Sequence, residues 1–499
     1  MRITKVVITI YALLFALLGV GFWVAPELLA ARFNIVALGV PGFSTLRGDM
    51  GGMFFALSAL CLVGLWTGRR APLMAAALAL SAVIVGRLLG WAVTGSPAGL
   101  AANLPIEIGA VVVLALHVRG QKDPPAEPVP TGRIARNAAI WAGGAAAVAA
   151  VMALALHSPA IQDRMFAAFV RQNVGRDNSA LLGDDALRVA TCGTSAPLPS
   201  LARAKACVAV MAGGKIYIVD SGPESTKNLM LWGLPLDRVA GVMITHFHSD
   251  HIGDLGELNL QTWVPGRPAP LAVYGGPGIE QVVAGFNEAY TLDEGYRTAH
   301  HTAELMPPAT AQMIAHTVTM PEVPGPGGVR STVVLDDGSM KVTAIETNHA
   351  PARPAYAYRF DFKGRSAVIT GDTTNYAPLA VASSGTDILV SEALNREMIR
   401  TLEQSAREKN RPRVAHIMRD IQSYHISPTE AADMANKAGA RLLVLYHLLP
   451  APDNGIAKEI FARGLDSARH GGKWDLADDG SLYTLPVGST AFEIGRVPQ

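Results

Sequence analysis

The N-terminal third of the chain gathers its apolar side chains into five long runs, and this pattern constrains the fold more than any other feature. A helix needs about 20 apolar residues to cross the hydrocarbon core of a bilayer. The runs, three of them uncharged, are Val6–Val24, Gly51–Gly68, Ala71–Ala92, Leu100–Val118 and Ala138–Leu156. We therefore expect an all-α transmembrane domain; a cleaved signal peptide at the first run and buried core helices are the alternatives.

Lysine and arginine in short loops predict the orientation of such helices, because cytoplasmic loops carry an excess of both. If all five runs cross, the basic segments 2–5, 69–70 and 119–136 fall on one side, which we expect to be the cytoplasm. Arg32 and Arg47 fall on the other side and weaken this bias. The chain after the fifth helix would then leave a bacterial-type inner or plasma membrane on its periplasmic or extracellular side.

Four charged residues lie in or beside the apolar runs: Arg47, Asp49, Arg87 and Glu107. Charges within a bilayer are costly, so we expect them either to pair inside the bundle or to line a site. The expected organisation is a four-helix transmembrane domain at 1–120, a Pro-rich loop at 121–136, a fifth transmembrane helix at 137–157, a juxtamembrane connector at 158–186 and a separate domain at 187–499.

The separate domain alternates short β-type runs with helical segments, which predicts an α/β fold of two sheets packed face to face with helices outside, an αββα sandwich. A helix is expected at Pro428–Ala438, where Ser427 is a suitable cap. The expected strands are Arg188–Thr191, Cys207–Met211, Lys215–Asp220, Val239–Thr245, Leu271–Tyr274, Thr332–Leu335, Lys341–Glu346, Ala355–Phe362, Ser366–Thr370, Asp387–Val390 and Arg441–Tyr446.

Net charge and cysteine content exclude some classes of protein. A formal charge of +1 gives no sign of a polyanionic partner. Three cysteines are too few for a disulfide scaffold or a thiolate metal site. Cys192 and Cys207 lie on neighbouring expected strands, where they form either a disulfide, as suits an extracytoplasmic domain, or two buried free thiols.

Four metal-ligand side chains lie within six residues directly after an expected strand: His246, His248, Asp250 and His251. At this spacing one loop can serve two metal ions, with the first two histidines on one and Asp250 and His251 on the other. A lone histidine is usually a surface or core residue, but four such groups in one loop predict a two-metal centre.

Three further candidate ligands follow other expected strands. His349 follows Lys341–Glu346, Asp372 follows Ser366–Thr370, and His447 follows Arg441–Tyr446. Imidazole and carboxylate ligands suit zinc, so we expect two Zn²⁺ in this domain, with Mn²⁺ or Fe²⁺ as alternatives.

These motifs resemble the metallo-β-lactamase superfamily over about Leu187–Pro486, and within it the branch of tRNase Z and the related arylsulfatases and phosphodiesterases. The resemblance implies His246, His248 and His349 on one metal, Asp250, His251 and His447 on the other, and Asp372 bridging them. Further matching segments are Gly193-Thr194-Ser195, Asp220-Ser221-Gly222 and Ala357-Tyr358-Arg359-Phe360, the last with alanine where the branch has glycine.

Two more residues resemble motifs of this branch. Glu392, in Ser391-Glu392-Ala393, resembles the glutamate of its His-Glu-Ala-Thr motif, and His425 the histidine of its His-Ser-Thr motif, although Ile426 follows here. Such a carboxylate–imidazole pair either shuttles a proton to the leaving group or only supports the metal ligands.

The resemblance implies a hydrolase in which a hydroxide shared by two metals attacks an ester, with Asp250 orienting it and Glu392 and His425 assisting the leaving group. The branch's tRNA-processing members carry an RNA-gripping arm between the third histidine and the bridging aspartate, where this chain has only residues 350–371. We therefore expect a membrane-anchored hydrolase of a small-molecule or lipid-like ester (sulfate, phosphodiester or lactone) and do not expect a nucleic acid partner. The alternatives are a ribonuclease Z-like phosphodiesterase and a non-catalytic membrane sensor with a metal-binding outer domain.

The long segment between His251 and His349 is the expected place for a substrate pocket. It contains two adjacent histidines, His300 and His301, which either line that pocket or are ordinary surface residues. Tyr290, Tyr296 and Arg297 lie just before them.

Overall fold

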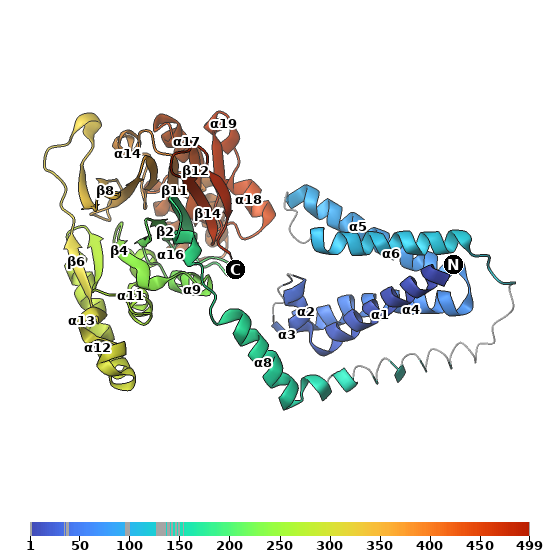
Figure 1. Cartoon of the computed structure of the whole chain (residues 1–499). Helices are drawn as coiled ribbons and strands as arrows, with labels where there is room; N and C mark the ends of the chain where they lie inside the picture. Colours follow the sequence, from blue (N-terminus) through green and yellow to red (C-terminus); the bar gives the residue numbers. More distant parts are fainter. Residues whose placement is uncertain are drawn as a thin grey trace. The chain divides into compact units, whose positions relative to one another are not determined.

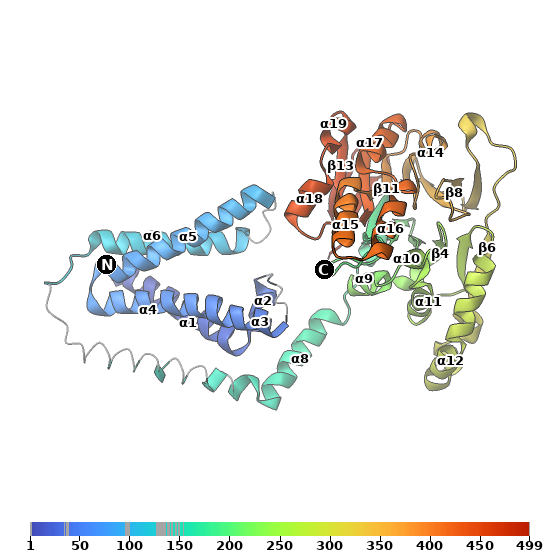
Figure 2. The ribbon, with the colours of Figure 1, turned by 180° about the vertical axis from the view of Figure 1, so that it is seen from behind.

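The computed structural model describes residues 2–33, 35, 39–94, 100–125, 136, 140, 143–144, 147, 150–152 and 154–498. The chain forms two compact units, Met1–Asn173 and Val174–Gln499 (Figures 1 and 2). Each unit has its own hydrophobic core, and each is described separately below.

The N-terminal unit is helical. Its described elements are α1 (Arg2–Val24), α2 (Pro26–Arg32), α3 (Gly39–Thr45), a π-helical turn (Leu46–Gly51), α4 (Gly52–Thr67), α5 (Arg70–Thr94), α6 (Leu100–Gly120) and α8 (Pro159–Asn173). Four described segments are long and apolar enough to cross a membrane by length and composition: Arg2–Val24, Gly42–Thr67, Arg70–Leu89 and Asn103–Gly120. They correspond to the first four expected runs, whereas most of the fifth, Ala138–Leu156, lies outside the described residues.

Polar contacts bring three helix ends of this unit together. Thr4 Oγ1 lies 2.7 Å from His117 Nδ1, which joins the start of α1 to the last turns of α6. The Gln121 side chain donates to the carbonyl of Gly68, between α4 and α5. The start of α1, the α4–α5 junction and the end of α6 therefore lie at one end of the bundle, together with their lysines and arginines.

The charges within the apolar helices are partly paired inside the unit. Arg87 Nε on α5 lies 2.8 and 2.9 Å from the two carboxylate oxygens of Glu107 on α6. Arg47 Nε donates to the Trp23 carbonyl at 3.1 Å. The sequence left open whether these charges pair inside the bundle or line a site. Arg87 and Glu107 pair inside the bundle.

The C-terminal unit contains two sheets. The first has the order β15-β14-β1-β2-β3-β4-β5-β6 and the second β13-β12-β11-β10-β9-β8-β7. The strands are β1 (Ala186–Gly193), β2 (Cys207–Ala212), β3 (Lys215–Val219), β4 (Val239–Met243), β5 (Leu271–Gly275), β6 (Met313–Thr317), β7 (Ser331–Asp336), β8 (Met340–Glu346), β9 (Tyr356–Phe362), β10 (Arg365–Ile369), β11 (Ile388–Leu394), β12 (Leu442–Leu449), β13 (Lys473–Leu476), β14 (Ser481–Pro486) and β15 (Glu493–Arg496).

Helices surround the two sheets, and the far part of α12 projects away from them (Figure 1). They are α9 (Ser225–Leu231), α10 (Ser249–Ile252), α11 (Leu255–Trp263), α12 (Ile279–Leu305), α13 (Pro308–Ala311), α14 (Ala377–Ala382), α15 (Arg396–Glu408), α16 (Pro412–Asp420), α17 (Pro428–Lys437), α18 (Gly455–Phe461) and α19 (Leu465–Arg469). In α17, Ser427 and Glu430 form the reciprocal hydrogen bonds of a capping box, which fixes the start of this helix.

Successive side chains along a strand pack in different hydrophobic cores, one between the sheets and one outside. On β1, Val189 faces the other sheet, where it joins Tyr217 of β3 and Phe360 of β9 in the central core. Ala190 faces outward and packs in a second core that includes Leu258 of α11. Side chains of successive residues point to opposite faces of a strand, so each sheet is buried on both sides. The αββα sandwich expected from the sequence is confirmed.

One disulfide links two neighbouring strands of the first sheet. Cys192 on β1 is bonded to Cys207 at the start of β2, and Cys61 on α4 is a buried free cysteine. Of the two alternatives left open by the sequence, the structure contains the disulfide.

Candidate metal centre

All seven expected ligands lie where strands of the two sheets end. β4 leads into a loop that carries His246 and His248, and the short helix α10 follows with the next two ligands, Asp250 and His251. The other three come from the second sheet, where His349 follows β8, Asp372 follows β10, and His447 lies within β12. The strands of two sheets therefore converge on one buried place.

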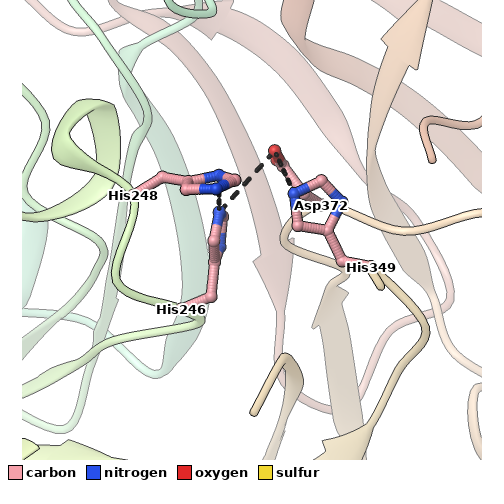
Figure 3. Close-up of side chains that lie close together, drawn as sticks. All are labelled: His246, His248, His349 and Asp372. Atoms are coloured by element: carbon pink, nitrogen blue, oxygen red, sulfur yellow. Dashed lines mark hydrogen bonds and ion pairs between the residues drawn. The ribbon is translucent and has the colours of Figure 1, made fainter. Parts of the chain in front are cut away.

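Three imidazoles and one carboxylate form the first cluster (Figure 3). His246 Nε2 lies 2.9 Å from His248 Nδ1. Asp372 Oδ2 lies 3.8 Å from His246 Nε2 and 3.6 Å from His349 Nε2. These are the residues that the sequence assigns to one metal, together with the expected bridging aspartate.

Asp250, His251 and His447 form a second cluster beside the first. His447 Nε2 lies 3.2 Å from both His251 Nε2 and Asp250 Oδ2. The other carboxylate oxygen of Asp372, Oδ1, lies 3.4 Å from His251 Nε2 and 3.4 Å from His447 Nε2. Asp372 thus turns one oxygen toward each cluster, which is the arrangement of a bridging ligand.

The polar atoms of this centre fit divalent metal ions better than they fit one another. His349 Nε2 and Asp372 Oδ1 are buried and have no hydrogen-bond partner within the described part of the chain. Buried polar atoms normally have partners, so two orphaned atoms facing a common space require an explanation. Nitrogen and oxygen donors converging in two groups supply it, because a cation in each group would satisfy them.

Hydrogen bonds from the surroundings orient the ligands. Asp220, directly after β3, lies with Oδ2 2.8 Å from His251 Nδ1 and accepts from Thr245 N and Thr245 Oγ1, each at 2.8 Å. His349 Nδ1 lies 2.9 Å from the carbonyl oxygen of Tyr424. Each contact engages Nδ1 and leaves Nε2 for the centre, which is how ligating imidazoles are commonly fixed. The sequence pointed to Asp220 only as a family segment.

A bulge in β12 aims His447. The β11–β12 register passes from Glu392 opposite Tyr446 to Ala393 opposite Leu448, so His447 is the extra residue. Its φ of 44° lies in the left-handed region, a backbone conformation that residues other than glycine rarely adopt. Bulges beside active sites commonly redirect one side chain, and this one turns the imidazole into the second cluster.

Opposing charges tune the ligands. Burial, reinforced by the charge of His251, lowers the pKa of His246 well below its ordinary value. Burial alone would lower the pKa of His251 too, but Asp372 and the neighbouring carboxylates raise it well above the ordinary value. Burial would raise the pKa of Asp372, yet the imidazoles around it hold that pKa well below the usual range. The centre therefore keeps the Asp372 carboxylate anionic and attracts positive charge.

Glu392 and His425 form a buried pair at the edge of the centre. His425 Nδ1 lies 2.9 and 3.0 Å from the two carboxylate oxygens of Glu392, and 3.8 Å from Asp372 Oδ2. Glu392 also accepts from the backbone N–H of Thr373 at 2.9 Å. Burial opposes protonation of His425, but the Glu392 carboxylate raises its pKa above the ordinary value. The arrangement can hold a proton beside the metal centre.

A basic helical hairpin, α15–α16, lies between Glu392 and His425 along the chain. Four of its side chains are exposed and have no acidic partner within 4 Å among the described residues: Arg400, Lys409, Arg411 and Arg413. The hairpin ends four residues before Tyr424, whose carbonyl holds His349. The net charge of the whole chain does not reveal this patch. The five acidic residues of α12, against one arginine, offset the positive charge of the hairpin.

The expected pocket residues on the long segment lie on α12, which the sequence did not predict. His300 and His301 are both exposed on this helix, with ring centroids 6.2 Å apart, so they are surface residues. Tyr290 instead packs against the small core formed by Leu260, Trp263 and Met306.

Known proteins resemble this chain in sequence and structure. A family model described as the metallo-beta-lactamase superfamily matches residues 203–420. Ribonuclease Z of Mycobacterium avium (strain 104) is 32% identical over 296 residues, covering 59% of this chain and 96% of the relative; ribonuclease Z of Mycolicibacterium paratuberculosis is 31% identical with the same coverage.

Solved structures match the same share of the chain. The short form of human tRNase Z is 20% identical with a TM-score of 0.43, covering 60% of this chain and 100% of that one. The metallo-beta-lactamase fold protein YhfI from Bacillus subtilis is 22% identical with a TM-score of 0.41 and the same coverage.

One expectation from the sequence is wrong. We did not expect a nucleic acid partner, yet the relatives that align over almost their whole length are named ribonuclease Z. The expectation rested on a near-zero net charge and on the short segment 350–371. Net charge averages over the acidic α12 and the basic hairpin, so it carries no information about either surface.

Proposed function

The chain belongs to the metallo-β-lactamase superfamily and is a metal-dependent hydrolase of ester bonds; from that premise we propose that it is a ribonuclease Z-like phosphodiesterase that acts on RNA. The observation that carries the proposal is the position of Asp372 between the two ligand clusters, 3.4 to 3.8 Å from imidazole nitrogens of both. A carboxylate shared in this way is suited to a two-metal site.

We assign two Zn²⁺ to the centre, because nitrogen and carboxylate donors suit zinc. His246, His248 and His349 would hold one ion, Asp250, His251 and His447 the other, and Asp372 both. When bound, the two ions would lower the pKa of a water molecule and neutralise the charge that develops on the phosphate oxygens. Asp250, at the margin of the second cluster, would also orient the nucleophile.

His425 is proposed to give a proton to the leaving oxygen. Glu392 engages Nδ1 of this imidazole, so Nε2 remains to carry the proton, and Glu392 stabilises the protonated ring. Because Glu392 also accepts from Thr373 N, the pair is fixed to the backbone next to Asp372. A positioned acid of this kind typically accelerates such a step about 10²–10⁴-fold.

The basic hairpin α15–α16 supports RNA as the substrate class. Exposed lysines and arginines without acidic partners bind backbone phosphates, and this binding weakens as salt rises. Arg411 and Arg413 lie at the start of α16, whose other end leads toward Tyr424 and His425. RNA lying along this hairpin would reach the metal centre from its proton-donating side.

The test uses the zinc-loaded full-length protein in detergent, with a tRNA precursor bearing a 3′ extension and a small bis-aryl phosphodiester as substrates. We expect cleavage of both. In R411E/R413E the KM for RNA should rise at least tenfold, and the salt dependence of log KM should flatten by about 1.4, at about 0.7 per phosphate contact. Turnover of the small substrate should not change.

The matched control is K341E/K473E. Both lysines are exposed and lie at strand ends away from the centre: Lys341 near the start of β8, which leads to His349, and Lys473 opposite Leu442 at the start of β12. This double variant should behave like the wild type. Cleavage of neither phosphodiester by the zinc-loaded protein would refute the proposed function.

A second candidate function is hydrolysis of a small-molecule or lipid-like ester. It is favoured by the short connection between His349 and Asp372, which contains β9, β10 and their loops. Aryl sulfates and lactones therefore belong in the substrate panel. Faster turnover of one of these than of either phosphodiester would favour the second candidate.

We further propose that the apolar helices anchor the hydrolase in a membrane. Three helix ends that carry lysine and arginine gather at one end of the bundle, which we assign to the cytoplasm. With a fifth crossing, the hydrolase would lie outside the cytoplasm, so the RNA that it cleaves would be extracytoplasmic. The Cys192–Cys207 disulfide suits that compartment. Protease protection of a C-terminal tag in sealed inside-out vesicles tests this; digestion of the tag would contradict it.

A further inference from the structure

The N-terminal unit has a groove along two of its apolar helices. Its volume is about 580 Å³, and it is formed by the first half of α5 and the second half of α6. Met74, Leu78 and Leu114 contribute to its walls, together with several alanines. The only hydroxyl among the lining residues, on Ser81, donates to the carbonyl of Ala77 at 2.8 Å, so it needs no partner in the groove.

Two arginines line one end of this groove. Arg70 is the first residue of α5 and Arg119 the last but one of α6, so the antiparallel helices bring both side chains to the same end. Arg70 Nε is buried and has no hydrogen-bond partner among the described residues. The nearby Asp123 carboxylate accepts from the backbone N–H of Arg70 at 2.6 Å. Arg119 is exposed, and neither guanidinium group forms an ion pair with a described residue.

We propose that this groove binds an anionic phospholipid, with the phosphate on Arg70 and Arg119 and an acyl chain along α5 and α6. The inference rests on the proposed membrane anchoring and is independent of the hydrolase reaction. Apolar walls ending in a pair of cations match a lipid in both chemistry and direction, and basic pockets between helices on the cytoplasmic side bind anionic headgroups in this way. A zwitterionic lipid would gain much less from two adjacent positive charges.

The test measures lipid retained by the full-length protein. Wild type and variants are reconstituted in phosphatidylcholine nanodiscs containing a minor fraction of phosphatidylglycerol, and the lipids bound after extraction are counted by native mass spectrometry. R70A/R119A should retain phosphatidylglycerol about 30-fold more weakly, which corresponds to about 2 kcal/mol for two arginines. Phosphatidylcholine retention should not differ between wild type and variant.

The control R69A/K122A removes two positive charges at the same end of the bundle. Arg69 and Lys122 do not line this groove, so their loss should leave phosphatidylglycerol retention near the wild-type value. Equal retention by R70A/R119A and wild type would overturn the proposal, and so would an equal loss in both double variants. Carbonate washing of membranes separates the two hypotheses: wild-type protein that washes off refutes the anchoring, whereas protein that stays but shows no preference refutes the groove alone.

Discussion

Replacing Asp220 by asparagine should remove the second metal ion while leaving the protein folded. In the native centre, Oδ2 of Asp220 engages His251 Nδ1 and Thr245 Oγ1, and Oδ1 accepts from Thr245 N. An asparagine has one acceptor oxygen. If that oxygen takes the Oδ2 position, the NH₂ group faces the backbone N–H of Thr245. If it takes the Oδ1 position, the NH₂ group faces His251 Nδ1 and favours the tautomer that carries its proton on Nε2.

The size of the effect follows from the bond that is lost. A hydrogen bond to a charged group contributes about 1.5–3 kcal/mol. Affinity for the second ion should therefore fall about 10- to 150-fold, since each 1.4 kcal/mol is a factor of ten. The first cluster should be less affected, because His349 is held by the Tyr424 carbonyl rather than by Asp220. At limiting zinc, D220N should contain close to one ion per chain.

The assay is metal content by mass spectrometry after dialysis at fixed free zinc, with phosphodiester turnover measured on the same samples. D475N is the matched control, because Asp475 also accepts a hydrogen bond, from the Tyr483 hydroxyl at 2.6 Å, and lies in β13 away from the centre. D475N should retain two ions. Two tightly bound ions and normal turnover in D220N would refute the assignment of Asp220 as the residue that positions His251.

Three further outcomes are expected. His425→Ala should lower kcat about 10²–10⁴-fold on substrates with poor leaving groups and far less on activated aryl esters, at unchanged metal content; equal losses on both would contradict a proton donor. Under denaturing, non-reducing conditions a thiol titration should count one free cysteine, Cys61, and it should count three after reduction. In urea unfolding, C192S/C207S should lose about 3 kcal/mol of unfolding free energy, because the disulfide closes a loop with a sequence separation of 15. Chelation should abolish phosphodiester turnover and zinc should restore it; full activity in the chelator would exclude a metal-dependent reaction.

The sequence predicted those parts of the fold that depend on local residue patterns. The strand runs of the C-terminal unit alternate or are continuously apolar. The expected ligands lie at their ends, so the sequence alone could place His246 after one strand and Asp372 after another. β6 and β13 to β15 were not predicted, because these runs are short and, in β6 and β15, mostly exposed. The helix α12 was missed because only Ile279 and Val283 on it are fully buried, which leaves little apolar periodicity to read.

The parts of the site that depend on tertiary contacts could not be predicted in the same way. Asp220 supports His251 only because β3 pairs with β4 in parallel, which sets the end of one strand beside the loop of the next. The carbonyl of Tyr424 reaches His349 across a separation of 75 residues. The exposed arginines of α15–α16 are interleaved in sequence with glutamates, and only ion pairs such as Arg407 with Glu403 reveal which cations remain unpaired.

The central claim is that Asp372 joins two metal sites into one phosphodiester-cleaving centre. Titrating zinc into the metal-free full-length protein, with phosphodiester turnover as the readout, tests it most directly. The account predicts that turnover rises until two equivalents are bound and then stays constant, and that D372A reaches no measurable turnover at any zinc concentration. A plateau at one equivalent, or wild-type turnover in D372A, would contradict it.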